Sequence, residues 1–168
     1  MPIQGIEQKE FLPIDDNLRL RRYDGVHDFA FAWHQDPELV WLIDGDKEPY
    51  TQDLLDRMYA FLAANGECYI IEVFESGQFI PIGDVTLFTD DFAIAIGDKR
   101  YWKAGLGFKV LNRMIERARE LEFAEILVEE IYDWNQGSRR LFEKCGFEAV
   151  KKTAKGWSYR KVLCKQER

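Results

Sequence analysis

Hydrophobic and polar positions alternate along several short runs of the chain, and each such run predicts a strand. Residues 18–23 alternate after a polar N-terminal arm, and further strands are expected at 67–74, 78–88 and 91–97. Pro81 falls near the start of the third of these strands, where a missing backbone N–H does least harm. Consecutive strands joined by short turns predict an antiparallel meander.

Apolar positions at helical spacing separate and follow these strands. Short helices are expected at 24–34 and 37–43, and Thr51 can cap a third helix that ends at 65–66. A longer amphipathic helix follows, and its apolar face comprises Leu106, Val110, Leu111, Met114, Ala118 and Leu121. The remaining expected elements are a strand at 125–132, a helix at 136–145 and strands at 147–154 and 157–164. This order predicts a mixed α+β fold.

Length and composition favour one domain. The chain has 168 residues, of which 46% are hydrophobic, and this suffices for one core, so we expect a single domain over 1–168. Residues 1–4 lack the pattern of a signal peptide, and no stretch approaches the roughly 18 apolar residues of a spanning helix. We therefore expect a cytoplasmic protein with no membrane partner.

Cysteine and histidine are too few and too scattered to predict a metal site. Cys68, Cys145 and Cys164 are odd in number and lack metal-like spacing, so we expect reduced, mostly buried thiols. His27 and His34 are the two histidines, and we expect both on helix surfaces. The sequence thus predicts no metal and no nucleophilic Cys-His pair.

A glycine-containing turn, Trp102 to Gly107, precedes the long amphipathic helix. Gly105 and Gly107 allow the backbone to approach an anion, and the first N–H groups of the helix have no intrahelical partner. Lys103 and Lys109 flank the turn. Such a turn suits a nucleotide diphosphate, although on its own it is more often a turn and nothing else.

A second cluster favours the diphosphate interpretation. It follows the expected strand at 125–132 and comprises Asn135, Ser138, Leu141, Phe142, Gly146 and Phe147. Together with the turn, in which Trp102 replaces the usual Gln or Arg, this spacing resembles the GNAT superfamily of N-acetyltransferases, which bind acetyl-coenzyme A. The pattern is closest to the bacterial branch that acetylates ribosomal proteins and small amines. The resemblance covers 17–163 and implies one acetyltransferase domain with an N-terminal arm at 1–16.

The resemblance implies a GNAT-like α+β fold with a mostly antiparallel central sheet of about seven strands, flanking helices and two splayed central parallel strands. Acetyl-CoA, as co-substrate, is expected to enter the gap between the splayed strands. The main chain of Ile94, Ala95 and Ile96 should pair with its pantetheine arm, and the glycine turn should hold its diphosphate. The other implied cofactor-binding residues are Lys103, Ala104, Gly105, Leu106, Gly107, Phe108, Asn135, Ser138, Phe142 and Lys144.

Acetyl transfer needs a base, because a primary amine with a pKa near ~10.4 is an ammonium at neutral pH. In the related bacterial branch a glutamate lies five residues before the motif asparagine, and Glu130 occupies that position here. Phe142 replaces the usual tyrosine acid, so Tyr132 is the candidate acid, and water can also serve. Alternation along the strand predicts that Val128, Glu130 and Tyr132 share one face.

Other assignments stay open. Asp90 and Asp91 precede the pantetheine-pairing strand, where some members of the family keep their base, so Asp91 is also a catalytic candidate. Glu130 can instead be an exposed acidic strand end beside Glu129. Because Phe142 cannot donate a proton, the domain can also be a sensor that binds coenzyme A without turnover.

Charge is distributed unevenly along the chain. Residues 1–98 carry 6 Lys and Arg against 20 Asp and Glu, whereas residues 99–168 carry 17 against 10. The basic half suits the phosphates of coenzyme A, and the acidic half attracts a cationic co-substrate and disfavours nucleic acid. We expect a small cationic amine as acceptor, aminoglycoside- or polyamine-like, with a peptide N-terminus as the alternative and a homodimer left open. The expected acceptor wall comprises loop 44–48, Asp90, Asp91, Trp33 and Trp41.

Overall fold

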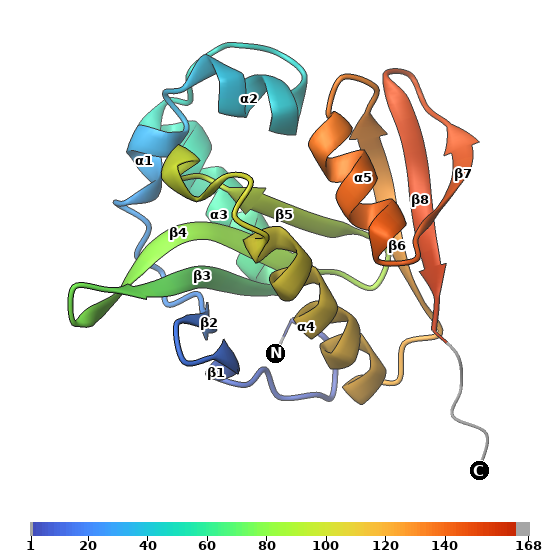
Figure 1. The fold of residues 1–168 in the computed structure, drawn as a ribbon, viewed down its shortest axis with the longest axis horizontal. Helices are drawn as coiled ribbons and strands as arrows, with labels where there is room; N and C mark the ends of the chain where they lie inside the picture. The colour runs from blue at the N-terminus through green and yellow to red at the C-terminus, as the bar shows by residue number, and fades with distance from the viewer. Residues whose placement is uncertain (1, 164–168) are drawn as a thin grey trace.

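The computed structural model describes residues 2–163, which form eight strands, five α-helices and one short 3-10 helix. Their order is β1 (Phe11–Asp15), β2 (Leu18–Arg22), α1 (Ala30–Trp33), α2 (Pro37–Asp44), α3 (Gln52–Asn65), β3 (Glu67–Glu75), β4 (Gln78–Leu87), β5 (Phe92–Ile96), η1 (Lys99–Tyr101), α4 (Leu106–Glu120), β6 (Glu125–Tyr132), α5 (Gln136–Lys144), β7 (Glu148–Lys152) and β8 (Gly156–Val162). The strands form two antiparallel sheets, ordered β1-β2-β3-β4-β5 and β6-β8-β7. Figure 1 shows the smaller sheet, with α5, beside the larger one.

The two faces of the five-stranded sheet carry different helices. Helix α4 lies on one face and α3 on the other (Figure 1). In β5, Ile94 and Ile96 pack into the core that contains α4, whereas Ala93 packs against the core that contains α3. Because side chains alternate along a strand, Ala95 shares the face of Ala93. The small side chains of β5 therefore leave space on the α3 side.

Strands β5 and β6 are neighbours that belong to different sheets. They approach each other at the start of β5, where Asp91 Oδ1 accepts a hydrogen bond from the backbone N–H of Glu129 at 2.9 Å. In the described part of the chain no strand ladder joins them, so the outer edge of β5 is open. This gap is the splayed pair that the family resemblance predicts. The strand count differs, with eight strands in two sheets rather than one sheet of about seven.

The N-terminal part differs from the sequence prediction in two elements, an additional strand and a shorter helix. The expected polar arm contains β1, which pairs with β2 and buries Leu12 completely. Pro13 breaks its pattern, and a proline is tolerated there because β1 is an edge strand. The expected helix at 24–34 is shortened to α1, because the Asp24 carboxylate caps a turn and Gly25 adopts a left-handed conformation with φ 93°.

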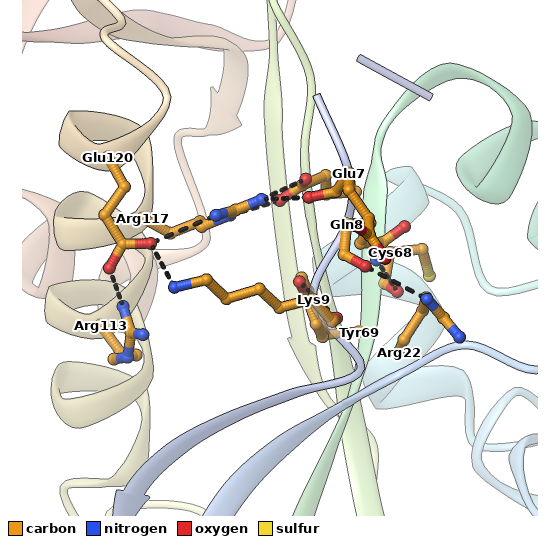
Figure 2. Close-up of polar contacts among 10 residues, drawn as sticks. Glu7, Gln8, Lys9, Arg22, Cys68, Tyr69, Arg113, Arg117 and Glu120 are labelled. Carbon is orange, nitrogen blue, oxygen red and sulfur yellow. Dashed lines mark hydrogen bonds and ion pairs between the residues drawn. The ribbon is translucent and has the colours of Figure 1, made fainter. Parts of the chain in front are cut away.

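A buried ion pair joins α4 to the start of β3. Arg117 Nε and Nη2 donate to Glu67 Oε1 and Oε2, each at 2.8 Å, and the two side chains are 4% and 0% exposed. Arg117 also donates to the backbone carbonyl of Glu7 at 3.1 Å and to Glu120 at 3.2 Å, and Lys9 reaches Glu120 at 3.3 Å (Figure 2). The N-terminal segment is thereby tied to α4.

Candidate active site

A cavity of about 560 Å³ lies where β5, β6, α2 and α5 meet, which is within the size range of small-molecule sites. Five carboxylates line it: Asp44, Asp84, Asp91, Glu129 and Glu130. Among the described residues no Lys or Arg contributes to the wall, and His34 is its one histidine. The wall is therefore strongly acidic.

The outer edge of β5 presents main-chain groups to the gap. The carbonyl group of Ala95 faces β4, because a Cβ placed on Gly83 of β4 would lie 2.2 Å from its oxygen. The N–H of Gly97, two residues further on, also faces β4 and donates to the carbonyl of Ile82. The peptide groups of Ile94 and Ile96 consequently face the gap. Of the three residues that the sequence assigns to the pantetheine arm, Ile94 and Ile96 turn main-chain groups to the gap, although the Ile96 carbonyl already accepts from the Trp102 indole, and Ala95 lines the cavity.

The glycine turn opens α4 as the sequence predicts. Gly105 is the N-cap, with φ 77°, and no side chain caps the first N–H groups of the helix, at 106–108. Lys103 is exposed and also left-handed, with φ 62°. Trp102 donates its indole N–H to the carbonyl of Ile96 at 2.7 Å and so fixes the turn to the end of β5. The uncapped N–H groups fit an anion such as a diphosphate.

The start of α4 lies against α5. A Cβ on Gly107 would lie 3.1 Å from Leu141 Cδ2, so this glycine allows the two helices to pack closely. Lys144 of α5 places its Nζ 4.4 Å from the centre of the Phe108 ring. Ala104 is exposed beside them. The basic end of α5 thus stands next to the turn.

The predicted residues of α5 do reach the cavity. Asn135 is the N-cap: its Oδ1 accepts from the N–H of Ser138 at 3.1 Å, and its Nδ2 donates to the carbonyl of Leu42 at 3.2 Å. Phe142 is buried edge-on against Phe92, with ring centres 5.9 Å apart. Asn135, Ser138 and Phe142 line the wall together. The contact with Leu42 joins α5 to α2 and uses one of the two Nδ2 protons of Asn135, so the other proton is left for a ligand.

Glu130 reaches the cavity from a β-bulge in β6. The pairing register shifts between Val128 and Ile131, so Ile131 continues the buried face of Val128, and the prediction that Val128 shares a face with Glu130 and Tyr132 is wrong. Glu130 and Tyr132 both line the cavity. Glu130 Oε2 accepts from the Thr153 hydroxyl and from the N–H of Lys155 at 3.1 Å. Within residues 2–163 its Oε1 accepts no hydrogen bond and is available to a ligand.

Tyr132 lines the cavity at the edge of an aromatic stack. Its ring lies 4.7 Å from Trp134, which stacks at 4.3 Å on Trp41 and donates to the Trp41 carbonyl at 2.9 Å. Burial, with nearby carboxylates led by Glu130, raises the pKa of the Tyr132 phenol. The described residues provide no hydrogen-bond partner for its hydroxyl. Tyr132 is thus a protonated phenol that can donate.

The expected acceptor wall is present in part. Asp44 and Asp91 line the cavity, whereas Asp90, Trp33 and Trp41 do not. Asp91 is half-buried, and its burial raises the pKa of its carboxyl although two backbone N–H groups oppose the shift. The carboxyl is therefore a stronger proton acceptor than an exposed aspartate.

Two buried side chains of the wall, Asp84 and His34, were missed from the sequence. Asp84, 7% exposed, accepts from the Tyr59 hydroxyl at 2.8 Å, and burial raises the pKa of its carboxyl. His34 is 2% exposed, and its ring packs 4.6 Å from Tyr50, so the prediction of a surface histidine is wrong. The available signal for Asp84 was a carboxylate in the middle of an apolar strand.

Cysteine chemistry and metal ligation add nothing to this site. Cys68 and Cys145 are free and buried, and burial raises the pKa of the Cys68 thiol to about 12, while Cys164 lies outside the described residues. Residues 2–163 contain no group of three or more His, Cys, Asp or Glu side chains placed to hold a metal ion.

No helix in that range has the length and apolar character needed to cross a membrane.

Comparison with models of known protein families assigns the chain to a family. The model of a family described as an acetyltransferase (GNAT) domain matches residues 17–148. The chain therefore belongs to the GNAT family and is an acyltransferase that uses acetyl-CoA as co-substrate. A search of curated proteins returned no match.

Solved structures share the fold at low sequence identity. An acetyltransferase from Agrobacterium tumefaciens str. C58 is 15% identical, with a TM-score of 0.73 over 94% of this chain and 97% of that chain. AAC(6')-Ib in complex with ribostamycin and coenzyme A is 19% identical, with a TM-score of 0.71 over 88% and 94%. RimL, a ribosomal L7/L12 alpha-N-protein acetyltransferase in complex with coenzyme A, is 15% identical, with a TM-score of 0.69 over 92% and 98%.

Proposed function

We propose that this enzyme transfers the acetyl group of acetyl-CoA directly to a primary amine of a small cationic molecule, aminoglycoside- or polyamine-like. The observation that carries the proposal is the cavity wall, to which the described residues contribute five carboxylates and no Lys or Arg. Carboxylates in a partly desolvated cavity attract ammonium groups more strongly than they do in water. A cationic acceptor is therefore favoured over a neutral or an acidic one.

The cofactor-binding part of the proposal follows the open edge of β5 and the glycine turn. The peptide groups of Ile94 and Ile96 pair with the pantetheine arm as an added strand. The N–H groups at 106–108 hold the diphosphate, with Lys103 and Lys144 adding positive charge nearby. When bound, acetyl-CoA supplies the acetyl thioester.

In the proposed chemistry Glu130 removes a proton from the acceptor ammonium, directly or through one water. The freed amine forms the C–N bond to the acetyl carbon while the C–S bond breaks, and the nitrogen then loses its second proton to water, so that the product is a neutral amide. Tyr132 donates its phenolic proton to the departing thiolate, and water can replace it because such a thiol has a pKa of roughly 8.5. Asp91 is the second candidate base, since burial raises the pKa of its carboxyl.

Thiol release from acetyl-CoA with a panel of amines tests the proposal. We expect release to depend on the acceptor, with polyamines and aminoglycosides ahead of neutral amines and of a peptide N-terminus. Fastest release with the peptide would favour N-terminal acetylation instead. Binding of acetyl-CoA without any acceptor-dependent release would favour a coenzyme A sensor.

Ionic strength gives a second readout in the same assay. Raising salt from low to physiological concentration should increase the acceptor KM, because exposed charges are screened beyond roughly 8 Å. The KM for acetyl-CoA in the same series shows how salt acts on the cofactor alone. An acceptor KM that does not change with salt, or a preference for acidic acceptors, would count against the proposal.

Replacing Gly107 by valine should raise the dissociation constant of acetyl-CoA at least about tenfold, or about 1.4 kcal/mol. A Cβ there lies 3.1 Å from Leu141 Cδ2, so the larger valine side chain crowds Leu141 and disturbs the packing of α5 on the start of α4, beside the proposed diphosphate site. Calorimetry measures the affinity, and thermal melting confirms that the variant is folded. Gly137→Val is the matched control, because a Cβ at that helical glycine meets nothing within 4 Å. Equal affinities for both variants would remove the assignment.

Two expectations from the sequence stay predictions. One is a cytoplasmic location, and the other is the homodimer that the family resemblance leaves open.

A further inference from the structure

We infer that His34 and Asp84 form a second ammonium subsite, so that the acceptor carries two amino groups, one that is acetylated and one that this pair holds. The inference rests on the proposed amine transfer and names its substrate class more narrowly. Neither side chain is assigned above to the cofactor or to proton transfer. Both side chains line the cavity and are more than nine-tenths buried.

Asp84 presents to the cavity a carboxylate oxygen that has no donor among the described residues. Its Oδ2 accepts from the Tyr59 hydroxyl at 2.8 Å, whereas its Oδ1 accepts no hydrogen bond from residues 2–163. Oδ1 is not one of the inaccessible unpaired atoms of the described residues, so it stays in contact with the open space of the cavity, where water or a ligand can donate to it. Because Asp84 lines the cavity, a ligand there can supply that donor.

His34 presents a second acceptor in the same wall. Its Nδ1 lies 2.8 Å from the carbonyl oxygen of Ala30, and because a carbonyl can only accept, Nδ1 carries the proton. The other ring nitrogen, Nε2, has no partner among the described residues, and it offers a lone pair whenever it carries no proton. A ring contact with Tyr50 holds the imidazole in place.

An alkylammonium group matches this pair of acceptors. It has three N–H donors and no acceptor, and its charge compensates a buried carboxylate. Burial raises the pKa of the Asp84 carboxyl, and a bound cation would favour its ionised form. A neutral hydroxyl would satisfy one acceptor without compensating the charge.

The floor of the cavity separates this subsite from the proposed reaction centre. Asp84 pairs with Ala95 across β4 and β5, whereas Asp91 lies just before the start of β5 beside the backbone of Glu129. Four residues of extended strand span ~13 Å, and a hydrogen bond of about 3 Å at each end leaves ~7 Å between the two nitrogens of a ligand, roughly the length of a four- or five-carbon diamine. The methyl groups of Ala93 and Ala95 line the cavity along this path. An apolar floor with an acidic group at each end suits a carbon chain or ring that carries an amino group at each end.

Matched amines test the subsite. Putrescine has two amino groups on a four-carbon chain, and butylamine is the same chain with one. The wild-type protein should show a KM for putrescine at least about tenfold below that for butylamine. Asp84→Asn should raise the putrescine KM by about 10- to 100-fold and leave the butylamine KM and both kcat values within about twofold. Asp90→Asn, which removes an exposed charge outside the cavity, is the control and should change neither KM.

Calorimetry measures the affinity of putrescine for the complex of the protein with coenzyme A, in which no acetyl transfer can occur. Thermal melting confirms that Asp84→Asn is folded. Equal KM values for the two amines would overturn the subsite while leaving the transferase function intact. A fall in kcat for both amines with unchanged KM would also overturn it and make Asp84 a base. Putrescine binding that depends on Asp84, without thiol release from any amine, would support the subsite and refute the proposed transfer.

Discussion

Glu67→Gln should lower the free energy of unfolding by about 3–5 kcal/mol, because it leaves the buried Arg117 guanidinium with the partly exposed Glu120 as its remaining counter-charge. The wild-type pair has two contacts of 2.8 Å, and both side chains are nearly inaccessible to water. The remaining acceptors of Arg117, Glu120 and the carbonyl of Glu7, cannot replace a bidentate carboxylate (Figure 2). Urea unfolding followed by circular dichroism measures the loss.

Asp53→Asn is the matched control for this loss. Asp53 pairs with Arg57 at 3.0 Å on the surface of α3, where the side chains are 79% and 70% exposed. Exposed pairs contribute little, so the control should unfold at nearly the wild-type urea concentration. If Glu67→Gln lost no more stability than the control, the ion pair would not be a main stabilising contact between β3 and α4.

Elements with strong periodicity were predicted well from the sequence. Strands β3 to β6 and helix α4 lie within one or two residues of their expected positions, because each has a long alternating or amphipathic pattern bounded by turn residues. Strand β1 was missed because its run is short and contains Pro13. The bulge in β6 was also missed. Glu129 and Glu130 are both polar, so the sequence does not show at which of them the alternation of buried and exposed side chains shifts by one residue.

The candidate site was predictable where it depends on local motifs. The glycine turn and the α5 cluster identified the family, and Asn135, Ser138 and Phe142 do line the cavity. Contacts between distant segments were not predictable. His34 is buried because Tyr50 covers it, and Asp84 meets the cavity because β4 lies beside β5. The contact between His34 and Tyr50 leaves no signal in the spacing of residues, whereas Asp84 had one signal, a carboxylate in an apolar strand of the predicted meander.

Glu130→Gln should lower kcat by about 100-fold, the loss typical of a missing general base, with little change in acetyl-CoA affinity. The substitution keeps the shape of the side chain and an oxygen that can accept from the Thr153 hydroxyl or the N–H of Lys155. It removes the second carboxylate oxygen, which is the one available to the acceptor. Steady-state thiol release with the preferred amine measures kcat, and calorimetry measures the cofactor affinity.

Glu125→Gln serves as the control, since Glu125 starts the same strand and lies outside the cavity wall. It should keep wild-type turnover. Full activity of Glu130→Gln would move the role of base to Asp91, and Asp91→Asn should then show the loss of kcat instead. A loss in Glu130→Gln that follows weaker acetyl-CoA binding, with kcat unchanged at saturation, would mean that Glu130 shapes the cofactor gap through the β7–β8 hairpin and takes no proton from the amine.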